Sequence, residues 1–531
     1  MTDDLASCKR SRALRLPALI AAAFLFRVAL LSLAHNPGLH DPVHYFNLGR
    51  RLAEGQGFTI DYVWHYSRIP LEIRHGIDHW MPLAGLAAAA GIKLGGATPI
   101  AAAAAFIVAG ALTPLLTFCA AKQLELDDEY ALIAALFAAF VPDLASSSLR
   151  TDTTALNVIF IGAAILLLND GLRRERKLSF IMCGGMVGLA YLTRNDALIF
   201  FPSLTVVLAI RAGARGQRLR PRALFVYAGL TGVAFLLVIA PWLWRNQQEL
   251  GLLGTAEASR MFFMVEQADH YAYGIPLTWD SMLQRQSLGE LIGARLFQFA
   301  AAIKQILVSL AFPLNVFIAA GVWRLWRNRG LAGLLSLAPA FAWLLGILLF
   351  YPLLLPLKSQ AGSFEKAFLT IVPLLVPPAA LALRGFRRRP TLRWAIVGVT
   401  VMWLAGGSIY QFRRETAIAD TYYSSIQVLA DALAGLPDVT GDGEIRLMAQ
   451  DPYVLSYFGY ASVMTPLASR ADTLELGRRF EIDYLMMPAS RPALDALYLG
   501  EESDPRFVLA AHLADAGVTP FELYRLVYDD Y

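Results

Sequence analysis

The stretch HDPVHYFNLGRRLAEGQG, from His40 to Gly57, carries titratable side chains directly after an apolar run that ends at Ala34. A carboxylate such as Asp41 can take a proton from a reacting hydroxyl group. His44 lies one helical turn further on, where it can orient that carboxylate or its substrate. An aspartate before a proline is also typical of a helix cap, and the two roles are compatible. We therefore treat Asp41 as a candidate catalytic base and His44 as a second catalytic residue.

Further ionisable residues stand where other apolar runs begin or end. Ionisable side chains at the level of a membrane are costly, and they usually mark a functional cavity. Asp152, two residues after Arg150, is a third candidate catalytic residue. The residues that we predict to bind substrate are Asp78, His79, Arg194, Arg245, Lys358 and Lys366.

Each of these residues also has an ordinary alternative role. Asp152 can be only the structural partner of Arg150. Arg194 and Arg245 can be anchors whose charged ends reach the membrane interface. Lysines are frequent in loops whatever their function, so these alternatives stay open at the level of sequence.

The composition defines the class of protein that must hold these residues. The chain has 531 residues, of which 56% are hydrophobic and 17% are charged. Soluble domains average about 45–50% apolar and about 25% charged residues. Residues 411–531 carry 9 Lys/Arg and 19 Asp/Glu, a balance of −10, which leaves +14 for residues 1–410. Because the basic part is the apolar part, its charge indicates membrane topology and contact with lipids rather than nucleic-acid binding.

The apolar runs predict an α-helical membrane protein with about eleven spans, since a span needs about 20 mostly apolar residues. The predicted spans are 16–34, 98–121, 130–142, 150–169, 179–193, 197–210, 223–244, 299–322, 331–352, 366–383 and 392–410. With these spans, the clusters of arginine and lysine between the helices all fall on one side. The positive-inside rule makes that side cytoplasmic, together with the N-terminus. The first run also resembles a secretory signal peptide, which is an alternative for that segment alone.

The segments predicted to lie on the outer side of the cell (inner) membrane are 35–97, 143–149, 194–196, 245–298, 353–365 and everything after 410. The loop 35–97 would carry the catalytic residues of a transmembrane domain formed by residues 1–410. Residues 415–531 alternate short β-like runs with helical stretches, which predicts a small α/β domain outside the membrane.

Cysteine and histidine spacing does not indicate a bound metal. The three cysteines, Cys8, Cys119 and Cys183, suit neither a disulfide framework nor a cysteine-based metal site. Six of the eight histidines fall between His35 and His79, but no pair has the regular spacing of a zinc motif on one helix. We predict no cofactor, with a divalent ion as the alternative.

One carboxylate base and several cations on the outer face suit a particular chemistry. A sugar carried on a polyprenyl phosphate leaves behind a stable phosphate anion, which needs electrostatic stabilisation but no general acid. The acceptor hydroxyl then needs a single general base. A glycosidase usually needs two carboxylates in set geometry, because its leaving group must be protonated.

The motifs resemble those of the GT-C glycosyltransferases, membrane enzymes that use sugars linked to lipid phosphates. The branch is that of the protein O-mannosyltransferases and aminoarabinose transferases. The resemblance rests on DPVHY from Asp41, DHWMPL from Asp78, LTR before a helix, and PWLWRN. The mannosyltransferases carry Asp-Glu in the first of these motifs and His-Pro-Pro-Leu near the second. Here Pro42 replaces the glutamate, and Met81 stands in the place of the first proline.

The resemblance implies transfer of a sugar from a polyprenyl-phosphate donor to a lipid, glycan or protein acceptor on the outer side. The resemblance also implies that Asp41 would be the base, and that Arg194, Arg245 and a lysine at 358 or 366 would hold the donor phosphate. Two alternatives remain. A glycan ligase or polymerase would be expected to carry a large arginine-rich outer loop late in the chain. A transporter would often show inverted repeats and broken helices near the midplane.

Overall fold

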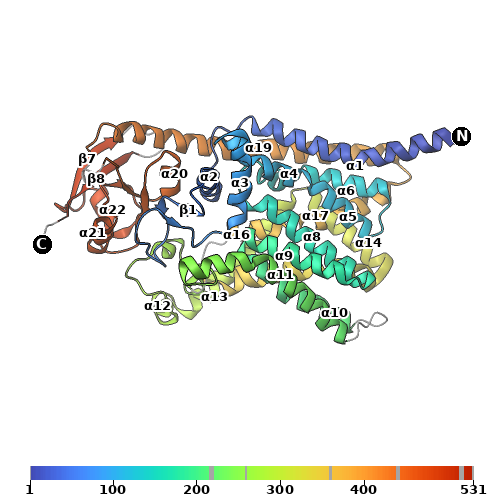
Figure 1. Cartoon of the computed structure of the whole chain (residues 1–531). Helices are drawn as coiled ribbons and strands as arrows, with labels where there is room; N and C mark the ends of the chain where they lie inside the picture. The colour runs from blue at the N-terminus through green and yellow to red at the C-terminus, as the bar shows by residue number, and fades with distance from the viewer. Residues whose placement is uncertain are drawn as a thin grey trace.

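The computed structural model describes residues 2–213, 221–256, 260–357, 361–437, 443–513 and 520–528. It has two parts along one long axis (Figure 1). One part is a bundle of helices, at whose far end the chain begins. The other part is a mixed sheet flanked by short helices, and the chain ends beside it.

The bundle is built from long apolar helices. Its longer elements are α1 (Thr2–Leu31), α4 (Pro99–Ala111), α5 (Thr113–Gln123), α6 (Asp128–Ala139), α8 (Thr153–Arg174), α9 (Lys177–Thr193), α10 (Phe200–Gly213), α11 (Pro221–Leu250), α13 (Leu288–Leu310), α14 (Leu314–Leu335), α15 (Ala338–Leu349), α16 (Ala361–Leu369), α18 (Pro377–Leu383) and α19 (Pro390–Leu433). Among the described residues, seven helices are long and apolar enough to cross a membrane, or nine if each of two bent pairs is one span. The multi-pass membrane class is therefore confirmed, whereas the number eleven is not.

The predicted span 299–322 is not one helix. The structure divides it between α13 and α14, which are separated at Ala311 and Pro313. Ala311 has a positive φ of 55°, and Pro313 has no N–H to donate to a helix. Hydropathy could not locate this break, because the apolar run continues through it. The predicted span 331–352 is divided in the same way, and α15 leaves α14 at an angle of 76°.

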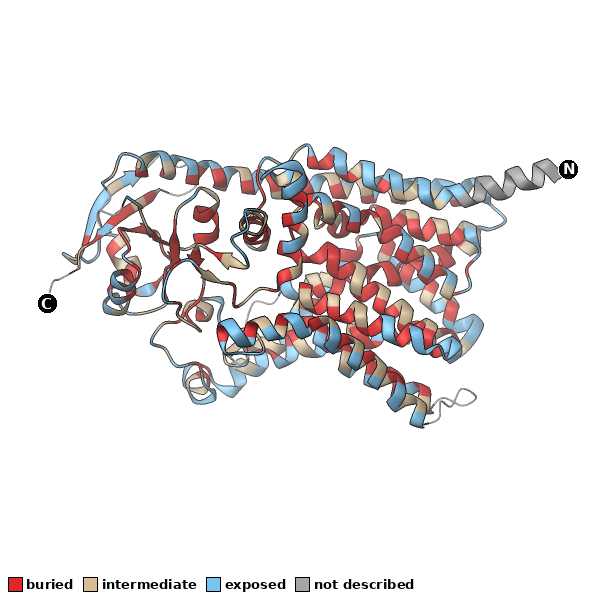
Figure 2. Ribbon diagram, in the orientation of Figure 1, coloured by how far each residue is buried: buried red, intermediate tan, exposed pale blue. Residues whose placement is uncertain are grey.

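Burial follows the expected membrane pattern (Figure 2). Side chains between helices are buried, while many large apolar side chains on the outside of the bundle are exposed, such as Leu237 and Trp403. In the most apolar part of α11 only 22% of the residues are buried. Exposed apolar rows of this length are stable only where lipid replaces water.

The basic residues between helices gather at one end of the bundle. The α5–α6 connection carries Glu125, which pairs with Arg173 and Arg329 at 3.3 and 3.0 Å. Asp127 pairs with Arg384 at 3.3 Å. Arg173 lies at the end of α8, Arg329 lies in α14 and Arg384 follows α18, so the structure groups the clusters that the sequence predicts to share one side.

The opposite end of the bundle joins the sheet. Helix α19 runs without a break from Pro390 to Leu433 and carries the chain out of the bundle beside the sheet (Figure 1). The strands are β2 (Tyr62–Val63), β4 (Leu447–Ala449), β5 (Ser462–Met464), β6 (Tyr484–Met487), β7 (Phe507–Leu513) and β8 (Phe521–Leu526), in the order β2-β5-β4-β6-β8-β7. Strands β2, β5, β4 and β6 are parallel to one another, and β8 and β7 join the sheet in antiparallel pairs.

The first outer loop and the tail are parts of one unit. Strand β2 belongs to the loop 35–97, yet Tyr62 pairs with Ser462 of the tail. The same loop contains α2 (Asp41–Ala53), α3 (Pro82–Gly95), β1 (Thr59–Ile60) and β3 (His75–Gly76). Helix α2 packs on α3 and on α20 (Pro452–Tyr457). The tail thus fixes the loop on which the candidate base stands.

Candidate active site

Asp41 is the first residue of α2, at the point where the loop turns into the helix. His40 precedes it with a φ of 60° and makes no side-chain capping hydrogen bond. The Asp41 carboxylate accepts a hydrogen bond from the Lys366 ammonium group on α16, with Oδ2 2.9 Å from Nζ. Its described partner is therefore a distant side chain rather than the backbone of its own helix.

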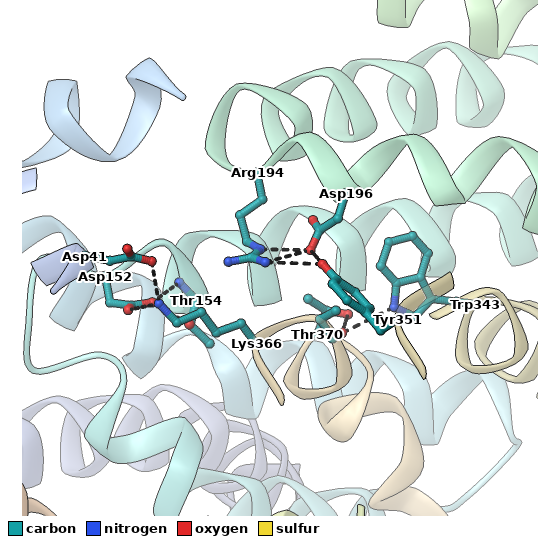
Figure 3. Close-up of polar contacts among 10 residues, drawn as sticks. Asp41, Asp152, Thr154, Arg194, Asp196, Trp343, Tyr351, Lys366 and Thr370 are labelled. Atoms are coloured by element: carbon teal, nitrogen blue, oxygen red, sulfur yellow. Dashed lines mark hydrogen bonds and ion pairs between the residues drawn. The ribbon is translucent and has the colours of Figure 1, made fainter. Parts of the chain in front are cut away.

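Lys366 also binds Asp152, so one ammonium group links two carboxylates (Figure 3). The distance from Nζ to Asp152 Oδ2 is 2.6 Å. The other oxygen of Asp152 caps α8 by accepting the Thr154 N–H at 2.8 Å, which fixes the carboxylate. Helix α16 is tied to the bundle by Trp343, whose indole N–H donates to the Ala367 carbonyl.

Lys366 controls the charge of Asp41. Burial alone would raise the pKa of Asp41, but the ammonium group beside it outweighs burial, and Arg194 adds to the effect. Together they hold the pKa of Asp41 well below its ordinary value of 3.8. The carboxylate is ionised at neutral pH, and it is a weak base as long as Lys366 stays bound to it.

Arg194 lies between this cluster and a second one (Figure 3). Its guanidinium group donates two hydrogen bonds to Asp196 Oδ2, at 3.0 and 2.9 Å. Tyr351, at the end of the α15 segment, donates to the same oxygen. The edge of the guanidinium group that carries these two N–H donors is thus held in place.

These groups border a cavity of about 540 Å³ between the bundle and the outer loop. Asp41, His79 and Arg194 line its polar part. Aromatic rings and aliphatic side chains line the rest, among them Tyr45, Trp64, Trp80, Tyr191, Leu198, Ile199, Phe350 and Leu355. A cavity that is charged at one side and apolar elsewhere suits a molecule with a charged head and a hydrocarbon part.

Five of the predicted residues are brought together. Asp41, Arg194 and His79 line the cavity, and Asp152 and Lys366 are joined to Asp41. These five come from separate parts of the chain.

His44 is buried beside the cavity rather than in it. Its Nδ1 hydrogen-bonds the Tyr62 hydroxyl, and its ring stacks on Trp80 with centroids 3.9 Å apart. Burial lowers the pKa of His44 to about 3, so the ring is neutral at physiological pH. No hydrogen bond between His44 and Asp41 occurs among the described residues, so His44 is placed to support the Trp80 ring.

Besides His44, the predicted residues Asp78 and Arg245 lie outside this cavity. Lys358 lies outside the residues that the structure describes. Asp78 is buried and pairs with His65, with 3.1 Å between oxygen and nitrogen. Arg245 donates to the carbonyls of Ile77 and Phe58, at 2.7 and 3.3 Å. Lys358 falls in the undescribed segment 358–360.

Several lining residues were not predicted. Asp196 stands two positions after Arg194 in the sequence RND, and this spacing is a usable signal. Tyr351 lies within an apolar run, and Trp64 and Trp80 lie in a loop, so none of the three differs in pattern from an ordinary core aromatic. His270 and Met261 belong to the long segment after α11, which the sequence indicates only as an outer loop.

Arg245→Ala is expected to loosen the outer loop rather than to weaken donor binding. A hydrogen bond from a charged donor contributes about 1.5–3 kcal/mol, and the Ile77 and Phe58 carbonyls would lose theirs. The melting temperature of the purified protein should therefore fall. If Arg245 instead holds the donor phosphate, as the sequence suggested, the KM for donor would rise with the melting temperature unchanged. Glu249→Gln removes the ion pair between Glu249 and Arg245 but keeps the arginine and its two carbonyl contacts, so it separates the contribution of the pair from that of the carbonyl contacts.

No group of three or more His, Cys, Asp or Glu side chains among the described residues is placed to hold a metal ion. Asp41 and Asp152 have the ammonium group of Lys366 between them.

Comparison with known proteins agrees with this architecture. Residues 78–244, less than half of the chain, match the family described as dolichyl-phosphate-mannose-protein mannosyltransferase. No curated protein matches the sequence.

Several solved structures are similar in fold. ArnT from Cupriavidus metallidurans in the apo state matches with a TM-score of 0.60 at 13% identity, covering 96% of this chain and 97% of ArnT. The same protein bound to undecaprenyl phosphate matches with a TM-score of 0.55 at 14% identity, over the same shares. The Archaeoglobus fulgidus oligosaccharyltransferase in complex with zinc and sulfate matches with a TM-score of 0.52 at 12% identity, covering 88% of this chain and 67% of that protein.

The class of protein is thereby defined. The chain has the GT-C fold of membrane glycosyltransferases, as the sequence motifs indicated. Because ArnT is covered almost from end to end, the likeness includes the tail as well as the bundle.

Proposed function

We propose that this protein is an integral-membrane glycosyltransferase. It moves one sugar from a polyprenyl-phosphate donor to an acceptor on the outer side of the membrane. The observation that carries the proposal is the ion-paired Asp41 at the polar side of an otherwise apolar cavity. The similarity to ArnT, one of whose structures contains undecaprenyl phosphate, supports a donor of this class.

In this proposal Lys366 has two successive partners. Before the donor binds, its ammonium group holds Asp41 ionised but weakly basic. A donor phosphate near Arg194 offers the ammonium group a second anion, and a shift toward it would free Asp41. The pKa of Asp41 would then rise because burial is no longer offset, which makes the carboxylate a stronger base.

The transfer itself is then a single displacement. The acceptor hydroxyl attacks the anomeric carbon and its proton passes to Asp41, while the bond to the donor phosphate breaks. Arg194 and Lys366 stabilise the charge that grows on the leaving phosphate. Attack from the face opposite the leaving group inverts the anomeric centre.

The direct test uses purified protein in liposomes that contain undecaprenyl-phosphate-linked sugars. Release of free undecaprenyl phosphate, measured by mass spectrometry, reports turnover before the acceptor is known. Lipids and glycans from cells with and without the gene then identify the sugar and the acceptor. A protein that releases no polyprenyl phosphate from any such donor, with a cell extract supplied as acceptor, would not have the proposed function.

We also propose that turnover needs no divalent metal ion, although a similar structure contains zinc. The reason is that the Lys366 ammonium group already supplies positive charge between Asp41 and Asp152, where a cation would otherwise bind. Dialysis against EDTA should leave the rate of donor turnover unchanged. Loss of turnover that magnesium, manganese or zinc restores would contradict this.

The proposed orientation has the basic end of the bundle in the cytoplasm and the tail outside. Helix α13 does not add a membrane crossing that would reverse this orientation. Arg295 near its start donates to the Leu357 carbonyl at 3.1 Å, and Ser309 near its end lies beside the Asp143 carboxyl group. Both partners belong to segments predicted to be outside, so α13 lies along the outer face rather than across the membrane.

A reporter fused after Tyr531 is therefore expected to behave as an extracytoplasmic protein. Alkaline phosphatase fused there should be active, and green fluorescent protein should be dark. A fusion within 214–220, between α10 and α11, should show the opposite pair of results. Fluorescence from the C-terminal fusion would overturn the orientation.

A further inference from the structure

A second cavity lies in the tail, apart from the candidate active site. Its volume is about 250 Å³, and none of its lining residues borders the larger cavity. Its walls come from the outer part of α19, from β4 with the loop and helix α20 that follow it, from β6 with the loop after it, and from the first residue of β8. The lining residues are Tyr422, Ser425, Ile426, Ala449, Gln450, Asp451, Leu455, Met486, Pro488, Ser490 and Phe521.

The cavity lies at the carboxyl ends of two neighbouring parallel strands, where ligands of open α/β sheets commonly bind. The chain leaves β4 to form β5 on one side of it, then crosses to form β6 on its other side. Neighbouring parallel strands whose connections diverge leave a crevice at their carboxyl ends, and ligands of open α/β sheets bind there. Ala449 and Asp451 stand at that end of β4, and Pro488 and Ser490 stand at that end of β6.

The polar group at the centre of this crevice is the carboxylate of Asp451. Tyr422 donates to its Oδ2 at 2.6 Å, and Tyr453 donates to its Oδ1 at 2.7 Å. Each oxygen keeps the capacity to accept another hydrogen bond. No ion pair within the described ranges of the chain includes Asp451, so its two described partners are neutral hydroxyl groups.

The remaining walls combine hydroxyl groups with apolar surface. Ser425 and Ser490 are hydroxyl-bearing, while Ile426, Leu455 and Phe521 are apolar. The volume is slightly below the range of about 300–1,000 Å³ that is common for drug-sized ligands. A ligand of monosaccharide size fits these limits, since it has hydroxyl donors for the carboxylate and C–H faces for the apolar walls.

We propose that this crevice binds a polyhydroxylated small molecule of monosaccharide size, neutral or amino-substituted, through Asp451. An acidic sugar is excluded, because its carboxylate would face that of Asp451 without a cation between them. The site differs from the donor cavity and does not depend on sugar transfer.

The test is a binding measurement on the full-length protein in nanodiscs. The probes are the methyl glycosides of a neutral hexose, an aminohexose and a uronic acid, observed by saturation-transfer NMR and titrated by calorimetry. Binding of the neutral or amino sugar in the millimolar range is expected for a ligand of about a dozen non-hydrogen atoms. The uronic acid should not bind.

Two variants assign the binding to the crevice. Asp451→Asn keeps the shape but removes the carboxylate, and it should weaken binding by about tenfold or more. Ala449→Leu should block the crevice while leaving Asp451 in place. Asp431→Asn, an exposed carboxylate on the same α19 helix, should bind as the unmodified protein does. Melting temperatures establish that each variant is folded, and if Ala449→Leu is not, Asp451→Asn alone decides.

Three results would overturn the proposal. The first is that neither the neutral nor the amino sugar binds the unmodified protein. The second is binding that survives in folded Asp451→Asn, which would place the sugar outside this crevice. The third is a uronic acid that binds as tightly as the hexose. None of these readouts requires turnover, so a protein without transferase activity still tests the site.

Discussion

Asp41→Asn is expected to reduce sugar transfer by about a hundredfold or more, the usual scale for loss of a general base. Asparagine has nearly the same shape as aspartate, but its amide oxygen does not take up a proton at neutral pH. The hydrogen bond described for the Asp41 side chain is to Lys366 rather than to the backbone of α2, so α2 should stay folded. Donor affinity should change little, because Arg194 and Lys366 remain.

The measurement is the rate of donor turnover in liposomes, together with donor affinity and melting temperature. Asp280→Asn, an exposed carboxylate on α12 (Trp279–Arg285), is the matched control and should transfer at the unmodified rate. If folded Asp41→Asn protein transfers sugar at nearly the unmodified rate, the base must be sought elsewhere. Asp152 is then the next candidate, since it shares the same ammonium group.

Lys366→Met should cause the second-largest loss, in both stability and transfer. Removing the ammonium group leaves two carboxylates close together without their shared cation, and breaking a buried ion pair costs about 3 kcal/mol. Asp41 and Lys366 are partly exposed, so the actual loss should not exceed this value. Transfer should fall as well, because the leaving phosphate loses one of its two cations.

The stability difference between Lys366→Met and the unmodified protein should depend on pH. The pKa of Asp41 is lowered in the folded protein, so the ion pair contributes fully above the ordinary value of 3.8. Its contribution is lost as the pH falls below that value. In the variant, burial raises the pKa of Asp41, so protonation on acidification relieves the repulsion. The gap in melting temperature should thus be widest at neutral pH, narrow toward pH 4 as Asp41 of the variant is protonated, and be lost only below that pH.

Two controls define the origin of these effects. Lys304→Met removes an exposed lysine of α13 and should alter neither stability nor rate. Lys366→Arg should retain the pairing in part, because the charge remains but the fork geometry differs from that of a single ammonium group. A gap in melting temperature that stays constant from pH 7 to pH 4 would show that Lys366 acts through packing and not through its charge.

The sequence alone grouped the polar residues that lie at the end of the bundle next to the sheet. Apolar runs and basic connections assign a depth to each polar residue, because charged groups are too costly to leave in hydrocarbon. That reasoning identified Asp41, Asp152, Arg194 and Lys366 at the same level. The α/β character of the tail was also readable, since it depends on the local alternation of apolar residues.

The tertiary structure alone decided which residues at that depth meet. Asp41 and Lys366 are 325 positions apart, and their contact depends on how α2 and α16 are placed around the bundle. Arg245 and Asp78 were predicted at the same level, yet Arg245 binds a carbonyl group of the loop 35–97 and Asp78 pairs with His65 inside that loop. Depth is set by each residue's own transfer free energy, which a sequence shows. Lateral position is set by the packing of whole helix surfaces, which hydropathy does not record.

The same distinction explains the sheet and the broken helix. β2 is two residues long and completes the tail's sheet through pairing with Ser462 and Val463, a long-range contact with no local signature. The break at Ala311 and Pro313 interrupts an apolar run without changing its hydropathy. The sequence thus determines what each segment prefers and how deep it lies. Only the packed structure determines which segments become neighbours, and the candidate active site is made by that choice.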